Sequence, residues 1–352
     1  MKNKIFVFSF LIIIYGFMIV SIFDKNLEVS YNERRVLATV PRFEFSTKLS
    51  NKVEKYLLDH FPLRDEFRKI KGYFNYFVLN KLENNDIYLK DNYVFKSIYP
   101  TNKKSIENYN NYLDNMSSLF SEDNNVYLMI IPDKNYYLDD ENFLNIDYDY
   151  LYDNVGVNYN KIDIRNILSL DDYYYTDTHW RQEKLDKVIK EISLNMNFKY
   201  KDVDYEVNSY PNFYGVYYSE SLNGKTDVLN YLSNDTISSS KVYYLENNKL
   251  TSVYNTSKLN LMDSYDVYLD GASSYIEITN NNSGNDKELV IFRDSFGSSI
   301  SPLLIEYYNK ITIIDNRYVS SEYFTNFIEF NTQDILIMNS TMIINDSFTL
   351  KN

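Results

Sequence analysis

The sequence predicts an α/β fold in which helices enclose a parallel sheet, preceded by a membrane-spanning N-terminal helix. Two patterns predict the sheet. Short continuous apolar runs, typical of strands buried on both faces, occur at 126–131, 289–292, 311–314 and 335–338. Helical spacing of apolar residues is clearest at Ile300, Leu303, Leu304, Tyr307 and Tyr308. Strands that alternate with helices along a chain form parallel sheets.

The N-terminal segment, 1–24, is predicted to be an uncleaved signal anchor. Lys2 and Lys4 precede an uncharged apolar run at 5–23, close to the roughly 20 residues that cross a bilayer. The basic leader favours a cytoplasmic N-terminus, so we expect a single-pass membrane protein whose remaining residues lie outside the cytoplasm. A cleaved signal peptide is the alternative, but its apolar region is about 7 to 15 residues long and ends in small residues.

The second segment, 25–85, is predicted to be an extended arm followed by a helical stalk. Residues 26–48 are polar and include Pro41, which is typical of an extended arm. Beyond it, apolar residues at helical spacing predict one or two amphipathic helices, which would form a stalk or a packing layer. These residues are Tyr56, Leu57, Phe61, Phe67, Ile70, Phe74 and Phe77.

The third segment, 86–352, is predicted to be the main domain. A further helix is expected after residue 180, because Leu185, Val188, Ile189 and Ile192 share one face. An irregular insertion at about 200–286 is rich in Asn, Ser and Tyr and contains weak strand alternation. The chain's 37 Tyr residues suggest either a carbohydrate-stacking surface or ordinary packing, and their even dispersion favours packing.

Composition excludes several classes of function. A formal net charge of −13 opposes binding to nucleic acid or to anionic membrane surfaces, which require clustered Lys and Arg. The absence of cysteine excludes disulfides, thiol catalysis and cysteine-ligated zinc, and two histidines exclude a three-histidine metal centre. We therefore expect neither a metal nor a cofactor.

Two separate blocks predict a split Ser-His-Asp site. In Tyr175-Thr176-Asp177-Thr178-His179-Trp180, one of the two histidines follows a carboxylate by two residues. The block Ile291-Phe292-Arg293-Asp294-Ser295-Phe296-Gly297 supplies a hydroxyl. We predict Ser295 as nucleophile, His179 as base and Asp177 as the group that orients the imidazole. The other histidine, His60, precedes Phe61-Pro62 and is expected to be a structural helix end.

Ser295 lies between a predicted strand and a predicted helix, the context of an esterase nucleophile. The free N–H groups of that helix start could hold an oxyanion, and Gly297 would allow close backbone approach. Alternatively, Asp294 or Ser295 only caps the helix, and Asp177 only forms a surface turn. Trp180 could pack beneath the imidazole or line an acyl site.

These blocks resemble the DHHW family and the related alginate O-acetyltransferase (AlgJ/AlgX-like) proteins, which are SGNH-hydrolase-like. The likeness rests on Asp177-Thr178-His179-Trp180 together with residues 289–317. Further matching pieces are 32–38, 59–64, Pro132-Asp133-Lys134, Phe213-Tyr214-Gly215 and Ile314-Asp315-Asn316-Arg317. Thr178 stands where the first histidine of the DHHW motif would be, as in the alginate group, and Arg293 stands where many esterases have glycine.

The resemblance implies a flavodoxin-like three-layer α/β/α core and a triad formed by Ser295, His179 and Asp177. It also implies acetyl transfer onto an extracellular polysaccharide, with a multi-spanning membrane O-acyltransferase relaying the acyl group. Gly271 and Asn339 are candidates for a further oxyanion donor. Arg317 could bind an acidic sugar or pair with Asp315.

Three functions follow as hypotheses. The first is a membrane-anchored O-acetyltransferase that acts on a cell-surface or secreted polysaccharide. The second is a carbohydrate acetyl esterase, because the same triad serves hydrolysis. The third is a non-catalytic protein that binds or assembles an envelope polysaccharide.

Overall fold

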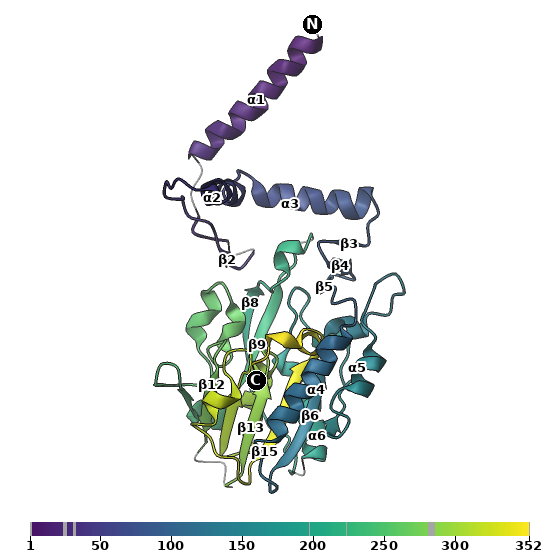
Figure 1. Cartoon of the computed structure of the whole chain (residues 1–352), viewed down its shortest axis with the longest axis vertical. Helices are drawn as coiled ribbons and strands as arrows, with labels where there is room; N and C mark the ends of the chain where they lie inside the picture. Colours follow the sequence, from purple (N-terminus) through teal and green to yellow (C-terminus); the bar gives the residue numbers. More distant parts are fainter. Residues whose placement is uncertain are drawn as a thin grey trace.

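The computed structural model describes residues 2–23, 27–30, 33–196, 198–222, 224–280 and 286–351. Asp24, where the predicted anchor ends, residues 25 and 26, where the predicted arm begins, and Asn32 lie outside the described residues. Helix α1 (Lys2–Phe23) projects away from the rest of the molecule (Figure 1). Its stretch Lys4–Ser21 is long and apolar enough to cross a membrane, and none of it is buried.

The region after α1 forms an arm and two helices that lie between α1 and the α/β body (Figure 1). The arm contains the antiparallel strands β1 (Val29–Ser30) and β2 (Arg35–Val36). Helices α2 (Thr47–Asp59) and α3 (Arg64–Tyr73) follow, and a π-helical turn at Phe74–Val78 extends α3. The expected amphipathic helices are therefore present.

The arm is held to these helices by ion pairs and hydrogen bonds. The Arg35 guanidinium contacts both oxygens of Asp59 at 2.6 and 3.0 Å, and Asp59 also accepts the backbone N–H of Ala38 at 2.8 Å. His60 is the C-cap residue of α2, and its Nε2 lies 2.9 Å from the Ala38 carbonyl oxygen. His60 thus has the structural place expected for it at a helix end.

A small antiparallel sheet leads into the body and comprises β3 (Glu83–Asn84), β4 (Ile87–Lys90) and β5 (Tyr93–Lys96). The main sheet has eight strands in the order β11-β10-β12-β14-β13-β15-β6-β7. Five of them are parallel: β6 (Asn125–Ile131), β7 (Asn160–Ile162), β13 (Glu288–Arg293), β14 (Lys310–Ile314) and β15 (Asp334–Ser340). The predicted parallel α/β sheet is confirmed.

The insertion extends this sheet with three antiparallel strands. They are β10 (Lys241–Tyr244), β11 (Lys249–Thr251) and β12 (Tyr275–Thr279), and β12 pairs with β14. The insertion also forms a hairpin of β8 (Glu206–Phe213) and β9 (Asp227–Ser233), followed by the short helix α7 (Asp235–Ser239). The whole sheet is therefore mixed.

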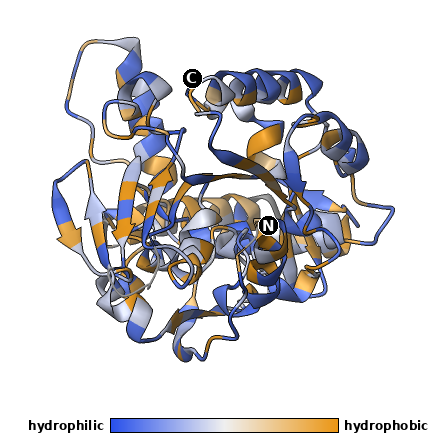
Figure 2. Ribbon diagram, turned by 90° about the horizontal axis from the view of Figure 1, so that it is seen from below, coloured by the Kyte–Doolittle hydropathy of each residue, from blue (hydrophilic) through white to orange (hydrophobic). Residues whose placement is uncertain are grey.

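Helices cover both faces of the sheet, as a three-layer α/β/α core requires. Alternate residues of β13 sort to opposite faces: Leu289 and Ile291 pack with one apolar cluster, and Val290 and Phe292 with another. The first cluster includes residues of α6 (Asp186–Asn195) and α8 (Gly297–Leu304). The second includes residues of α4 (Lys103–Ser117), α5 (Tyr148–Asn154), α9 (Ser321–Phe324) and α10 (Thr341–Asn345). Figure 2 shows apolar residues along the sheet and on the inner sides of the helices.

Short 3₁₀ turns complete the fold at Lys134–Tyr137, Leu170–Asp172, Gln182–Lys184, Tyr218–Glu220, Thr256–Asn260, Ser264–Val267 and Ser347–Thr349. Many tyrosines serve the core: Tyr109, Tyr112, Tyr173, Tyr174, Tyr268, Tyr275 and Tyr308 are among the largest fully buried side chains. Their burial supports the packing interpretation of the tyrosine-rich composition.

Candidate active site

The turn between β13 and α8 presents Ser295 at the carboxyl edge of the sheet. One oxygen of Asp294 accepts the backbone N–H of Phe296 at 3.0 Å, and the other accepts that of Ser340, at the end of β15, at 2.8 Å. Asp294 therefore fixes the turn, which leaves the Ser295 hydroxyl available for another partner. A Cβ atom at Gly297 would lie 2.6 Å from Cβ of Arg293, so this close approach requires glycine.

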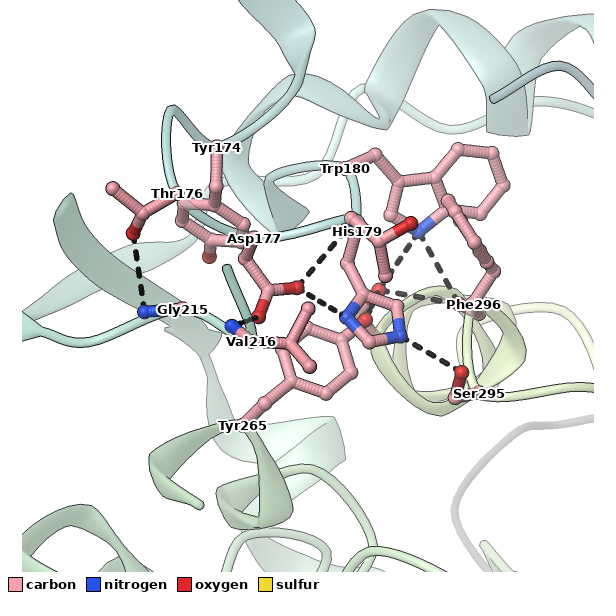
Figure 3. A network of polar contacts seen from close by, with 12 residues as sticks. Tyr174, Thr176, Asp177, His179, Trp180, Gly215, Val216, Tyr265, Ser295 and Phe296 are labelled. Atoms are coloured by element: carbon pink, nitrogen blue, oxygen red, sulfur yellow. Dashed lines mark hydrogen bonds and ion pairs between the residues drawn. The ribbon is translucent and has the colours of Figure 1, made fainter. Parts of the chain in front are cut away.

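Ser295, His179 and Asp177 form a continuous hydrogen-bonded chain (Figure 3). The Ser295 hydroxyl oxygen lies 2.8 Å from Nε2 of His179, and Nδ1 of His179 lies 2.6 Å from Oδ1 of Asp177. A carboxylate at Nδ1 favours the tautomer that carries its proton there, which leaves Nε2 free to accept the serine proton. His179 is buried and Ser295 is half-buried, so the hydroxyl remains reachable from solvent.

The carboxylate of Asp177 is fully buried and has a donor on each oxygen. Oδ1 accepts the backbone N–H of His179 at 3.0 Å, and Oδ2 accepts that of Val216 at 2.8 Å. Arg34, from the arm, places Nη1 3.4 Å from Oδ2, and its other terminal nitrogen pairs with Asp263. Burial alone raises the pKa of Asp177, but His179, these hydrogen bonds and Arg34 outweigh it and hold the pKa below its usual range. Asp177 is thus kept ionised.

Lys134 holds the loop that carries Asp177 and His179. Its buried ammonium group donates to the carbonyl oxygens of Tyr174 and Tyr175, each at 3.2 Å, and of Asp177 at 2.8 Å. Burial lowers the pKa of Lys134 to about 7, against the opposing effect of nearby carboxylates, of which Asp177 is the strongest. Three backbone acceptors converge on one side chain, so Lys134 fixes the path of this loop.

Two further contacts fix the same loop from the insertion. Asp227 accepts the backbone N–H groups of Tyr175 at 2.7 Å and Thr176 at 2.8 Å, and also the Thr176 hydroxyl at 2.7 Å. Gly215 lies against the loop, because a Cβ atom there would come within 2.3 Å of the Thr176 carbonyl group. Its N–H donates to the Thr176 hydroxyl at 3.1 Å (Figure 3).

Tyr265, also from the insertion, stacks on the imidazole of His179. The ring centroids are 3.9 Å apart and the planes differ by 9°. The Tyr265 hydroxyl donates to the Ser299 hydroxyl of α8 at 3.0 Å. The side chain of Tyr265 is therefore fixed by this hydrogen bond as well as by the ring stack. A fixed aromatic face restricts rotation of the imidazole. The sequence offered no signal for Tyr265, since tyrosines occur throughout the chain.

Trp180 packs beneath the site and does not line it. Its side chain is fully buried, and its indole N–H donates to the Phe296 carbonyl oxygen at 3.2 Å and to the Ser299 hydroxyl at 2.9 Å. The contact between Trp180 and Phe296 is edge-to-face. Trp180 therefore connects the loop that follows His179 to the start of the helix that follows Ser295.

The three other predicted site residues do not bond to the triad. Arg317 makes two hydrogen bonds to Asp315, at 2.9 and 2.7 Å, which is the pairing considered above as the alternative to sugar binding. Gly271, at φ +85°, uses its N–H to bond the carbonyl oxygen of Tyr268 at 3.2 Å. Asn339 is buried, and its side-chain oxygen accepts the Tyr109 hydroxyl at 2.8 Å.

The helix start offers fewer free N–H groups than its sequence suggested. The N–H groups of Phe296, Gly297 and Ser298 bond to the Asp294 side chain, the Asp294 carbonyl and the Ser295 carbonyl, respectively. Within the described residues, the N–H of Ser295 itself has no hydrogen-bond partner. That group is the oxyanion donor that the geometry favours. In the same part of the chain, no three His, Asp or Glu side chains are grouped as metal ligands.

Comparison with known structures supports this fold. A DHHW family protein from Eubacterium siraeum is similar, with a TM-score of 0.62 and 18% identity over 77% of this chain and 97% of that chain. Bacillus cereus PatB1 with a sulfonyl adduct has a TM-score of 0.60 and 18% identity over 77% and 100%. The O-acetyltransferase domain of Pseudomonas putida AlgJ, at a TM-score of 0.40 and 9% identity over 74% and 93%, is too distant to support an argument.

The sequence matches no family model and no curated protein. At 18% identity the likeness concerns the fold, and it agrees with the resemblance read from the two sequence blocks. The chain shares its α/β/α fold with a DHHW family protein and with PatB1.

Proposed function

We propose that this chain is a membrane-anchored, extracytoplasmic O-acetyltransferase that modifies a cell-surface or secreted polysaccharide. One observation carries the proposal: the chain of contacts from Ser295 through His179 to Asp177, at 2.8 and 2.6 Å. A serine hydroxyl, a neutral imidazole and a buried carboxylate in this order form an activated nucleophile. In this proposal residues 1–24 anchor the protein, 25–85 form the arm and stalk, and 86–352 carry out catalysis.

The first half-reaction forms an acetyl-enzyme. Nε2 of His179 takes the proton of Ser295 while the serine oxygen attacks the carbonyl carbon of an acetyl ester. The backbone N–H of Ser295 stabilises the negative oxygen of the tetrahedral intermediate. The intermediate collapses when the bond to the leaving group breaks, and imidazolium of His179 protonates that leaving group. Asp177 stays ionised and stabilises the imidazolium.

The second half-reaction passes the acetyl group to a glycan hydroxyl. His179 removes the proton of that hydroxyl as its oxygen attacks the carbonyl carbon of acetyl-Ser295. The serine oxygen leaves and regains its proton from His179, so the enzyme returns to its starting state. If water attacks instead, the products are acetate and free enzyme, which is the esterase alternative.

The acyl donor and the location are part of the same proposal. Helix α1 is long and apolar enough to cross a membrane, which would hold the catalytic domain beside the bilayer. A multi-spanning membrane O-acyltransferase would then deliver the acetyl group to Ser295 at the outer surface. The similar PatB1 structure carries a sulfonyl adduct, and we expect Ser295 to react with sulfonyl electrophiles because it is hydrogen-bonded to a base.

A comparison of three chains with a chromogenic acetyl ester tests this function. The full-length protein, Ser295→Ala and Ser298→Ala are assayed with and without an oligosaccharide acceptor. Ser298 is the matched control, because it is a serine in the first turn of α8, close to Ser295 in sequence, and is not bonded to His179. Ester cleavage that increases with acceptor and yields acetylated oligosaccharide supports transfer, whereas cleavage indifferent to acceptor supports hydrolysis. Equal rates of ester cleavage for wild type and Ser295→Ala would contradict both enzymatic functions and favour the non-catalytic, polysaccharide-binding protein.

A further inference from the structure

Helix α3 and the turn that extends it carry an apolar stripe that faces away from the protein. Its members recur at helical spacing and keep between 44% and 68% of their surface exposed: Leu63, Phe67, Ile70, Phe74 and Phe77. Apolar helix faces normally pack against a core. The apolar face of α3 points outward instead, so it does not form the packing layer that was one of the two alternatives considered for these helices. Val53, Leu57 and Leu58 of α2 are exposed as well. We call these eight residues the platform face.

The opposite side of α3 makes the contacts with the rest of the protein, and most are polar. Arg64 pairs with Glu33 of the arm at 2.9 Å, and Arg68 pairs with Glu33 and, at 2.5 Å, with Glu220. Gly72 is buried against Leu222, where a Cβ atom would lie 2.7 Å from the leucine side chain. Helix α3 therefore contacts the rest of the protein mainly through its polar side, and its apolar stripe faces outward.

The platform face is continuous with the candidate membrane span. Phe17 of α1 stacks on Phe61, between α2 and α3, with ring centroids 5.3 Å apart and planes at 26°. The ring centroid of Phe17 is also 5.8 Å from that of Phe67, a member of the platform face. Since Phe17 belongs to the apolar stretch Lys4–Ser21, the platform face meets α1 within the part that would lie in lipid. Figure 1 shows α2 and α3 directly below α1 and across its end.

The charge of this region also suits a membrane surface. Residues 47–82 contain eight Lys and Arg against four Asp and Glu, although the whole chain has a net charge of −13. The overall charge opposes adsorption of the body to anionic lipid, whereas a local basic excess beside an apolar face favours it. Lys55, Lys69 and Lys71 are exposed, so their ammonium groups can reach lipid headgroups.

We propose that α2 and α3 lie in the outer surface of the bilayer that α1 crosses, with the platform face in lipid. The proposal rests on the membrane anchoring of the proposed function and not on its chemistry. Interfacial helices of this kind bury their apolar face by about 5–10 Å at the headgroup boundary. The segment 215–222 contacts α3 at Glu220 and Leu222 and contacts Asp177 at Val216, so the platform would hold the triad at a fixed short distance from the membrane.

Spin labels on single cysteines test the placement, because the chain contains no cysteine of its own. The full-length protein is reconstituted into vesicles of phosphatidylcholine and phosphatidylglycerol, with a label at Ile70→Cys or Phe77→Cys. Ile12→Cys in α1 reports the lipid interior. Leu250→Cys on β11, at 63% exposed, is the matched control for an exposed apolar residue on the body. Collision rates with oxygen, which enters lipid, and with a polar nickel complex, which does not, are measured by power saturation. Fluorescence of Trp180 verifies the fold of each variant.

We expect the ratio of oxygen to nickel collision rates to be several-fold higher at Ile70 and Phe77 than at Leu250. The ratio at these two positions should approach the ratio measured at Ile12. If the collision ratio at Ile12 is typical of lipid while the ratios at Ile70 and Phe77 equal the ratio at Leu250, the proposed placement of α2 and α3 is wrong and the anchor is unaffected. Protection of Ile70 and Phe77 from both reagents would also overturn it, because a protein partner or a second copy would then cover the face. A water-exposed Ile12 would contradict the anchor itself.

Discussion

Nε2 of His179 lies 2.8 Å from the hydroxyl oxygen of Ser295, although 116 residues separate them in the chain. Two elements create this contact. The turn between β13 and α8 presents Ser295, and the loop held by Lys134 presents His179. Because the base and the nucleophile are already bonded, no movement of either residue is needed to begin proton transfer.

The Asp177→Asn variant tests the orienting carboxylate. An amide in this place cannot stabilise the imidazolium and favours the wrong tautomer, so kcat for acetyl-ester cleavage is expected to fall by about 10⁴. Steady-state kinetics measure the loss. The matched control is Asp171→Asn, an exposed carboxylate in a nearby turn, which should leave the rate unchanged. A loss of less than tenfold for Asp177→Asn would show that this carboxylate does not orient His179.

Two variants of Tyr265 separate its ring from its hydroxyl. Tyr265→Phe keeps the stack on His179 and loses the bond to Ser299, while Tyr265→Leu loses both. Because an aromatic stack contributes about 0.5–1.5 kcal/mol, kcat/KM should fall about 2- to 10-fold further in the leucine variant. The measurement is the ratio of the two variants on one substrate. Equal rates would mean that the ring does not position the imidazole.

Arg34 connects the N-terminal arm to the triad, and its removal should change the pH dependence of activity. The guanidinium is one of the groups that hold the pKa of Asp177 low, so Arg34→Gln allows that pKa to rise. Protonation of Asp177 then begins at a higher pH, and the acid limb of the kcat/KM profile should shift upward in pH.

The control is Arg34→Lys, which keeps the charge and should shift the limb less. A purely structural role of Arg34 would lower the rate equally at all pH values, and that outcome would contradict the electrostatic account.

Lys134 should make stability depend on pH above neutrality. Its pKa is lowered to about 7 in the folded chain, chiefly by burial, against an ordinary value of 10.5. Between these pH values the unfolded chain binds more protons than the folded chain, so the free energy of unfolding rises with pH. Below about pH 7 both states hold the proton, and this contribution is constant.

The comparison is with Lys134→Met, which has no proton to release at this position. Denaturant unfolding from pH 6 to 9, followed by the fluorescence of the single Trp, measures both proteins. The stability of wild type relative to the variant should increase from about pH 7 upward. A difference that stays constant over this range would mean that Lys134 has an ordinary pKa.

The sequence predicted the sheet well where strands are buried on both faces. The four apolar runs correspond to β6, β13, β14 and β15, because a parallel strand enclosed by helices leaves a continuous apolar signature. The antiparallel strands β10, β11 and β12 were not predictable as part of this sheet. Their pairing is non-local, and only weak alternation marked the insertion.

The site was predictable only where a residue type is rare. Two histidines in the chain left few choices for a base, and the proposed Ser295, His179 and Asp177 lie together in the structure. Tyr265 was hidden among 37 tyrosines. Lys134 belongs to Pro132-Asp133-Lys134, one of the pieces that carry the resemblance. Its role depends on backbone carbonyls, which no side-chain pattern reveals. The spacing of apolar residues from Tyr56 to Phe77 predicted the helices correctly. Spacing alone does not reveal which way an apolar face points.

Mass spectrometry of the acetylated protein tests the central claim most directly. The full-length chain is mixed with an acetyl ester, quenched in acid within the first turnover and digested. The account predicts an acetyl group on Ser295 in the wild type and none at that position in His179→Ala, where proton transfer is lost. Acetyl transfer or ester cleavage that continues with no acetyl-Ser295, or with the acetyl group on another residue, would contradict it.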